Sequence, residues 1–165
     1  MPVILIGFMA AGKSSVARIL DENFVDTDEC LSEKFEMSIS EYVSKYGTDA
    51  FRQQETALLA DLLSSDRAQV IATGGGIIES KKNQSLLELQ TDVVYLQADF
   101  STLLQRLKKD SLCQRFIFEN SDLSDLEQIY KERLPIYEQL SRVTIDTTHL
   151  TASEAAELII EKTPF

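Results

Sequence analysis

Short apolar runs recur along the chain and are separated by amphipathic stretches of helical length. Apolar or β-branched residues gather at Val3–Ile6, Phe24–Val25, Gln69–Thr73, Val93–Gln97 and Val143–Asp146. Runs that are apolar almost throughout are typical of strands buried on both faces of a sheet. Because helical patterns lie between these runs, the sequence predicts an α/β fold built on a parallel sheet.

The helical stretches carry recognisable starts and faces. Three starts fit a capping box, in which a hydroxyl side chain and a Glu three residues later bond free backbone N–H groups. These pairs are Ser38 with Glu41, Ser124 with Glu127, and Thr151 with Glu154. The first helix is expected to bury Ile19 together with Val16 and Leu20. A long helix over Ala50–Leu63 is expected to offer Ala57, Leu58, Leu62 and Leu63 to the core.

The first strand runs directly into a phosphate-binding loop. Residues Gly7–Ser14 match G-x-x-x-x-G-K-[ST] between an apolar run and a helical pattern, so a chance glycine turn is the weaker alternative. Backbone N–H groups of such a loop point at the phosphates. Lys13 is expected to reach the β- and γ-phosphates, and Ser14 to bind Mg²⁺. The residues expected at the nucleotide are Gly7, Ala10, Ala11, Gly12, Lys13, Ser14 and Ser15.

Composition limits the partners and the compartment. The 165 residues are expected to form one domain over residues 1–165, since no linker divides them. A formal net charge of −11 argues against nucleic acid or an anionic membrane as partner. Cys30 and Cys113 form no metal or disulfide pattern, and no apolar run is long enough to span a bilayer. We therefore expect a cytoplasmic protein with reduced thiols.

Two carboxylates follow the second strand. Asp26 and Asp28 flank Thr27 at the end of the strand, where ligands of an open parallel sheet bind. One carboxylate is suited to act through Mg²⁺ and its waters, and the other to hold or deprotonate a substrate hydroxyl. An equally open alternative is that Asp28 is simply the N-cap of the next helix.

Two arginines and a triple glycine are candidates for a substrate site. Arg52 lies near a helix N-terminus, where a cation opposes the helix dipole, and Glu55 is spaced to hold it. A bidentate carboxylate site and an ordinary surface ion pair both remain open for this pair. Gly74–Gly76 favours close approach of a ligand to the backbone over a floppy turn. Pro135 is expected to kink its helix and so aim Arg133 at the cleft.

The stretch from about residue 109 to residue 123 has no clean periodicity and mixes aromatic with charged residues. A connection of this length inside a compact domain is usually a functional lid. Such a lid would exclude water and bring Arg115 to the transferring phosphate. An ordinary surface loop is the alternative.

Together these motifs resemble the shikimate kinase family over nearly the whole chain. The resemblance rests on the phosphate loop, Asp26-Thr27-Asp28, Phe51-Arg52 with Glu55, Gly74-Gly75-Gly76, and Arg133 before Pro135-Ile136-Tyr137. It implies a three-layer α/β/α P-loop kinase fold, with a five-stranded parallel sheet of order 2-3-1-4-5 and a mobile lid. It also implies transfer of the γ-phosphate of ATP to the 3-hydroxyl of shikimate. The products would be ADP and shikimate 3-phosphate, an intermediate of chorismate and aromatic amino-acid synthesis.

The resemblance also implies roles on the nucleotide side. Lys13 would stabilise the transferring phosphate, Ser14 would bind Mg²⁺, and Asp26 would contact this ion through water. Arg115 resembles the lid arginine that reaches the nucleotide phosphates. Arg106 and Asp146-Thr147-Thr148 lie where the family holds adenine.

On the acceptor side, Asp28 looks like the residue that holds the ring hydroxyls and acts as base. The residues that would grip shikimate are Arg52, Arg133, Gly74, Gly75 and Gly76. Three features depart from the family pattern, one of which is the absence from Thr147–Ser153 of a proline often seen in the adenine-binding turn. Ala10 stands where the family usually has Gly, and its methyl group is expected to require a negative φ. The sequence Arg115-Phe116-Ile117-Phe118 replaces the usual lid motif.

Two other functions fit parts of the pattern. Another small-molecule kinase, such as a gluconate kinase, would share the phosphate loop and an aspartate pair but would not need both Arg52 and Arg133. A non-catalytic P-loop protein would bind nucleotide without transferring phosphate. With ATP and a small acceptor as its partners, we expect the chain to be a monomer.

Overall fold

The computed structural model describes residues 1–65, 67–109 and 122–163, and within them five short strands form one parallel sheet. The strands are β1 (Val3–Ile6), β2 (Val25–Asp26), β3 (Val70–Ala72), β4 (Val93–Gln97) and β5 (Val143–Asp146). Their order in the sheet is β2-β3-β1-β4-β5, and every neighbouring pair is parallel. The α/β class and the 2-3-1-4-5 order are thereby confirmed.

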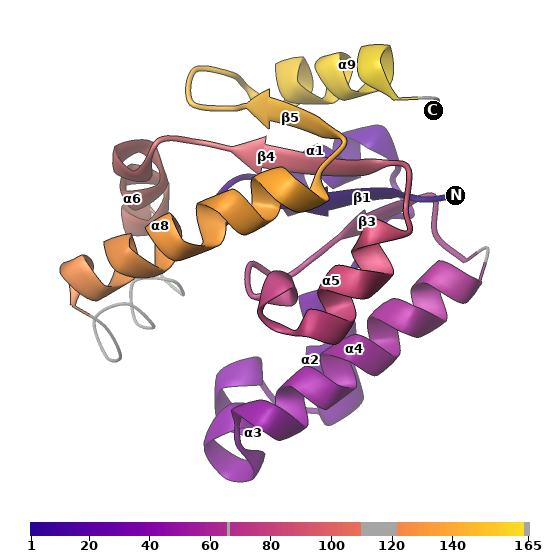
Figure 1. Cartoon of the computed structure of the whole chain (residues 1–165), viewed down its shortest axis with the longest axis vertical. Helices are drawn as coiled ribbons and strands as arrows, with labels where there is room; N and C mark the ends of the chain where they lie inside the picture. Colours follow the sequence, from indigo (N-terminus) through magenta and orange to yellow (C-terminus); the bar gives the residue numbers. More distant parts are fainter. Residues whose placement is uncertain (66, 110–121, 164–165) are drawn as a thin grey trace.

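Helices connect the strands and cover both faces of the sheet. They are α1 (Lys13–Leu20), α2 (Thr27–Phe35), α3 (Ile39–Tyr46), α4 (Thr48–Ser64), the 3₁₀ helix η1 (Ile77–Glu79), α5 (Lys81–Glu88), α6 (Phe100–Lys109), α8 (Leu123–Leu140) and α9 (Ala152–Lys162). In Figure 1, α8 and α5 lie in front of the sheet, α1 lies behind it, and α2 and α3 project at the bottom beside α4. Because all strands are parallel, their carboxyl ends share one edge, where a ligand site is expected.

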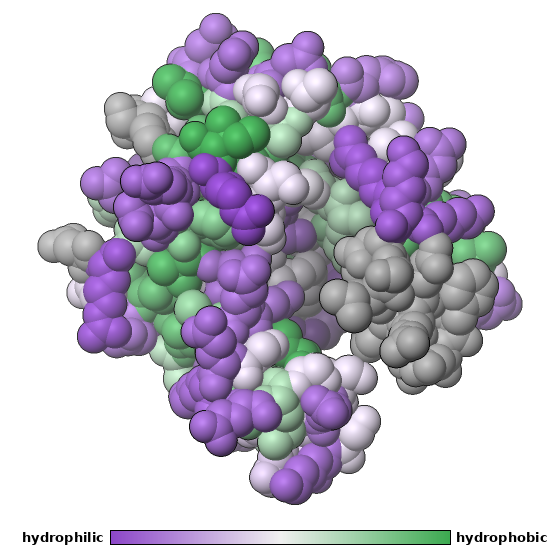
Figure 2. All heavy atoms as spheres, turned by 180° about the vertical axis from the view of Figure 1, so that it is seen from behind, coloured by the Kyte–Doolittle hydropathy of each residue, from purple (hydrophilic) through white to green (hydrophobic). Residues whose placement is uncertain are grey.

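The core follows the apolar runs. All residues of β1 and β3 are buried, and so are the first four of β4, as expected for strands covered on both faces. The edge strand β5 buries only Ile145. Figure 2 shows the opposite face from Figure 1, where hydrophilic side chains cover much of the surface and surround a hollow near its centre.

Two predicted core residues are instead on the surface. Ile19 is 50% exposed because α1 turns Ala17 toward the sheet beside Val16. Ala57 is exposed as well, since α4 buries Phe51, Glu55, Leu59 and Leu62. In short or weakly amphipathic helices, apolar spacing alone does not fix which stripe faces the core.

The predicted helix starts are right at two of three positions. Complete capping boxes are present at Ser38 with Glu41 and at Thr151 with Glu154. The expectation for Ser124 was wrong, because α8 begins at Leu123 with Asp122 as its N-cap, and the Ser124 hydroxyl donates to Asp122 instead. α8 continues as helix through Pro135 to Leu140.

Candidate active site

The phosphate-binding loop curls between β1 and α1. Gly12 precedes α1 with φ 92°, in the left-handed region that favours glycine. The Lys13 side chain is buried, and its ammonium group donates to the carbonyl oxygens of Gly7 (2.8 Å) and Phe8 (2.9 Å). Burial lowers the pKa of Lys13 to about 8, against the opposing charges of Asp28 and Asp26. The loop therefore holds one desolvated cation at its centre.

Ala10 corrects an expectation from the sequence. Its φ is 62°, so the residue adopts the left-handed conformation rather than the negative φ that its methyl group was expected to require. For a residue with a Cβ this conformation costs roughly 1 kcal/mol. The loop therefore adopts its conformation at Ala10 with a small amount of backbone strain.

Asp26 joins the loop to the second strand. One of its carboxylate oxygens accepts a bond from the Ser14 hydroxyl at 2.5 Å. The other accepts from the backbone N–H of Asp28 (2.9 Å) and of Glu29, so Asp26 is the N-cap of α2. The alternative in which Asp28 is the N-cap is therefore wrong, because the cap is Asp26, two residues earlier. Asp28 lies in the first turn of α2, which leaves its carboxylate available to the site.

Asp28 faces the triple glycine. Burial, with the nearby charge of Asp26, raises the pKa of Asp28, while Lys13 and Arg52 oppose the shift. A Cβ added to Gly74 would lie 2.5 Å from a carboxylate oxygen of Asp28. A side chain at position 74 would therefore displace the Asp28 carboxylate, and the Gly74 N–H donates to the Thr27 hydroxyl at 3.0 Å. A raised pKa suits a carboxylate that accepts a proton near neutral pH.

These groups share one cavity. A pocket of about 370 Å³ is lined by the loop, by both aspartates and by the glycine turn. The lining residues are Met9, Ala10, Gly12, Lys13, Ser14, Ser15, Asp26, Asp28, Thr73, Gly74 and Gly75. The structure therefore brings together residues that the sequence separates by up to 66 positions.

A second pocket opens on the other side of the loop. It has a volume of about 340 Å³ and shares Ala10, Gly12 and Ser15 with the first, while Ala11 lines this pocket only. Its opposite wall is formed by Arg106, Thr147 and the start of α9. Arg106 donates to the carbonyl oxygen of Thr147 at 2.7 Å and to its hydroxyl at 3.2 Å. Arg106 and Thr147, which the resemblance had implied for adenine, thus line one pocket together with the phosphate loop, and their role toward the nucleotide stays a prediction.

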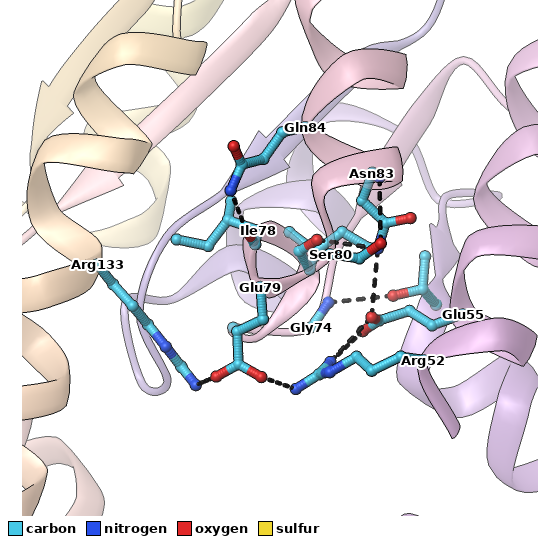
Figure 3. A network of polar contacts seen from close by, with 12 residues as sticks. Arg52, Glu55, Gly74, Ile78, Glu79, Ser80, Asn83, Gln84 and Arg133 are labelled. Carbon is cyan, nitrogen blue, oxygen red and sulfur yellow. Dashed lines mark hydrogen bonds and ion pairs between the residues drawn. The ribbon is translucent and has the colours of Figure 1, made fainter. Parts of the chain in front are cut away.

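Two arginines from different helices meet over the glycine turn (Figure 3). Arg52 of α4 donates to Glu55 at 2.8 Å and to Glu79 at 2.5 Å. Arg133 of α8 donates to the other carboxylate oxygen of Glu79. The surface-pair alternative for Arg52 is wrong, because only 1% of the Glu55 side chain is exposed. A Cβ on Gly76 would lie 2.4 Å from the Arg52 guanidinium, so this glycine makes room for the arginine.

Several supporting residues were given no role in the sequence analysis. Asn83 is fully buried and donates to Glu55 at 3.3 Å and to the carbonyl of Ile77 at 2.9 Å. The Tyr137 hydroxyl donates to the carbonyl of Gly75, and its ring stacks on Tyr95 with centroids 5.0 Å apart. These contacts fix the turn and the arginines. The sequence analysis also missed Glu79 as a site residue. It follows the triple glycine by three residues, and that short spacing is a signal that it lies near the candidate substrate site.

The predicted lid lies mainly outside the described residues. Residues 110–121, which include Arg115, are not described, so the role expected of Arg115 stays a prediction. Helix α6 ends before this segment at Lys109, and α8 begins after it at Leu123.

In the described part of the chain, no group of three or more His, Cys, Asp or Glu side chains is placed to hold a metal ion.

A phosphate-binding loop at the carboxyl edge of a 2-3-1-4-5 sheet, with an acidic pair and two arginines facing it, defines a P-loop kinase. The sequence model described as shikimate kinase matches residues 9–164. The chain belongs to the shikimate kinase family, whose members are ATP-dependent phosphotransferases.

Individual relatives agree with this assignment. The chain is 42% identical over 159 residues to the shikimate kinase of Streptococcus gordonii, covering 96% of this chain and 98% of the relative. It is 39% identical over 162 residues to that of Lactococcus lactis subsp. lactis, covering 98% of each. A solved structure of the Acinetobacter baumannii shikimate kinase in complex with shikimate superposes with a TM-score of 0.87 at 32% identity, covering 96% of this chain and 90% of the other.

The gluconate kinase alternative has weaker support. A gluconokinase of Sinorhizobium meliloti superposes with a TM-score of 0.56 at 17% identity, covering 97% of this chain and 90% of that chain. A likeness at that level extends to the fold alone.

Among the described residues, no helix combines the length and apolar character needed to cross a membrane.

Proposed function

We propose that this chain transfers the γ-phosphate of ATP to the 3-hydroxyl of shikimate, giving shikimate 3-phosphate and ADP. The observation that carries the proposal is the arginine pair, Arg52 and Arg133, held beside the cavity that contains Lys13 and Asp28. A planar guanidinium binds a carboxylate strongly and directionally. Two of them would fix a ring carboxylate so that a ring hydroxyl faces the phosphate.

On the acceptor side, the Asp28 carboxylate would accept a hydrogen bond from the reacting hydroxyl and take its proton as the oxygen attacks phosphorus. Its raised pKa supports this role because a stronger base accepts a proton more readily. Arg52 and Arg133 would hold the substrate carboxylate. The backbone of Gly74, Gly75 and Gly76 would let the ring approach closely.

On the nucleotide side, the backbone of the loop and Lys13 would bind the phosphates and balance the charge that moves onto the leaving oxygen. Without nucleotide, the Lys13 ammonium group makes two hydrogen bonds to loop carbonyls. Nucleotide phosphates would offer it stronger acceptors and raise its pKa again. Arg106 and Thr147 would flank the base, and Arg115 would reach the phosphates from the lid.

The oxygen donors fit Mg²⁺. The Ser14 hydroxyl and the Asp26 carboxylate lie 2.5 Å apart and face the same cavity. Mg²⁺ in phosphate-transfer sites is usually held by one or two side-chain oxygens, with waters and phosphates completing the shell. When bound, the ion would neutralise phosphate charge. We propose that Mg²⁺ binds the Ser14 hydroxyl directly and Asp26 through a water molecule. We further propose that the enzyme is cytoplasmic and monomeric.

The test is ADP release from Mg-ATP with shikimate, quinate, gluconate or no acceptor. Release that depends on shikimate is the expected result. Release with gluconate in its place would favour the other small-molecule kinase. Binding of ATP without release under any of the four conditions would contradict phosphate transfer by this chain.

A further inference from the structure

Glu79 occupies the two arginines in the way that a bound carboxylate would. One of its oxygens lies 2.5 Å from a terminal nitrogen of Arg52, and the other accepts from a terminal nitrogen of Arg133. Figure 3 shows the Glu79 carboxylate between the two guanidinium groups, which reach it from opposite sides. Since a substrate carboxylate would present the same pair of oxygens, it and Glu79 would compete for the same nitrogens.

The charge balance explains why this competition matters. The two arginines carry two positive charges, and the buried Glu55 carboxylate compensates one of them. With Glu79 in place the cluster is neutral, whereas without it one positive charge remains. A cluster with one positive charge is complementary to a monocarboxylate, and a neutral cluster is not.

The two glutamates differ in how easily they can leave. The Glu55 side chain is 1% exposed and accepts from both Arg52 and Asn83, so removing it would bury an unpaired cation. The Glu79 side chain is 40% exposed and ends the three-residue helix η1, so it can turn into water. Its arginine partners are only 22% and 14% exposed, but contact of Glu79 itself with water partly screens these pairs and makes them easier to break than a fully buried pair. Glu55 is thus the permanent partner of Arg52, and Glu79 the exchangeable one.

We propose that Glu79 is a specificity-determining residue that competes with the acceptor carboxylate for Arg52 and Arg133. A ligand with a carboxylate forms new ion pairs with Arg52 and Arg133 in place of those that Glu79 gives up, so displacing Glu79 costs it little binding free energy. An acceptor without a carboxylate gains nothing from displacing Glu79 and is excluded. Glu79 lowers the affinity for the true acceptor as the consequence of this selection. The inference rests on the proposed function, because it takes the acceptor to be a carboxylate.

The experiment is a calorimetric titration of shikimate into the wild type, Glu79→Gln and the control Glu88→Gln. Glu88 is exposed on α5 and forms no ion pair among the described residues, so its substitution changes the net charge equally without touching either arginine. We expect Glu79→Gln to bind shikimate about tenfold more tightly. The control should bind like the wild type.

A second variant, Glu79→Asp, keeps the charge but shortens the side chain, so that it can pair with only one arginine at a time. We expect its affinity for shikimate to lie between those of the wild type and Glu79→Gln. Thermal melting of each variant tests whether it is folded before titration.

Each other outcome overturns the inference. Equal or weaker binding by Glu79→Gln would mean that Glu79 holds the arginines in place rather than competing. A gain of the same size in Glu88→Gln would reduce the effect to net charge. Absence of shikimate binding in all the proteins, with ATP binding intact, would contradict the proposed function together with this inference, and so it differs from the first two results.

Discussion

The proposed nucleotide half and the proposed acceptor half of the site differ in the kinds of groups that form them. The proposed nucleotide half consists mostly of backbone groups on one continuous segment, and the buried Lys13 bonds to carbonyl oxygens of that segment. The acceptor half consists of side chains from α4, η1 and α8, joined by ion pairs through Glu79. The first half is therefore set by local conformation, whereas the second depends on the tertiary fold. We expect loss of the groups proposed to act on the transferring phosphate or proton, Lys13 and Asp28, to lower mainly turnover, and loss of the ion-paired arginines to lower mainly acceptor affinity.

The largest effect is expected for Lys13→Met. Removal of the cation at the transferring phosphate should lower kcat by about 10³-fold or more, as for other phosphate-stabilising charges. Steady-state release of ADP with saturating shikimate measures it, with exposed Lys82→Met as the control. A loss of less than tenfold would contradict the central position of Lys13.

Asp28→Asn should lower turnover by about 10²- to 10⁴-fold, the range for loss of a general base. Because Asp28 is proposed to contact the acceptor rather than the nucleotide, the affinity for ATP should stay nearly unchanged. Turnover and ATP binding are measured separately, the second by calorimetry. A large loss of ATP affinity would move Asp28 to the nucleotide half.

The buried charge of Lys13 predicts a pH dependence of stability in the protein without nucleotide. Its pKa is about 8 in the folded protein, whereas a lysine exposed to water has a pKa of 10.5, so between these values the unfolded chain binds more protons. The stability of the wild type relative to Lys13→Met should therefore rise from pH 8 to pH 10.5, by about 3 kcal/mol in total. Urea unfolding of both proteins at several pH values checks it. A difference independent of pH would mean that the ammonium group is not desolvated.

Arg133→Ala should chiefly weaken acceptor binding. Loss of a hydrogen bond to a charged group costs about 1.5–3 kcal/mol, so the KM for shikimate should rise about 10- to 150-fold while the KM for ATP changes little. Arg142→Ala is a matched control, because Arg142 donates to the carbonyl of Glu88 on the surface, away from both pockets. An unchanged KM for shikimate would refute a role of Arg133 in the acceptor half.

The smallest effect is expected for Asn83→Ala. Asn83 supports Glu55, which in turn holds Arg52, so its loss should raise the KM for shikimate about threefold and leave kcat within about twofold. Ser85→Ala, exposed on the same helix, is the control. If kcat fell and KM did not, Asn83 would act on the reaction through another route.

The sequence predicted the fold well where local patterns decide it. The apolar runs placed β1, β4 and β5 at their observed bounds, because strands of a parallel sheet are rich in apolar and β-branched residues and parallel pairing then follows from the helices between them. Local patterns were less reliable for helix faces. Ile19 was misplaced because one turn of α1 offers several apolar residues, and packing against the sheet chose Ala17.

The site was predictable to the extent that its residues belong to motifs. The loop from Gly7 to Ser14 and the aspartate pair could be recognised from spacing alone. Glu79 could not, because its partners Arg52 and Arg133 are 27 and 54 residues away and only the fold brings them together. Ala10 shows a different limit: the family usually has Gly at this position, but the alanine led to an expected negative φ, and the observed φ is positive.

The packing of Gly76 against Arg52 has a consequence for how this protein can evolve. Because a methyl group at position 76 would lie 2.4 Å from the guanidinium, Gly76→Ala requires the Arg52 side chain to move, whereas a smaller residue at position 52 would remove the conflict. The same dependence links Gly74 to Asp28. Each glycine is therefore coupled to its own partner, and a side chain at position 76 or 74 fits without displacement only after residue 52 or 28, respectively, has changed. The order of substitutions along any path to a new acceptor is thus constrained by the glycine turn.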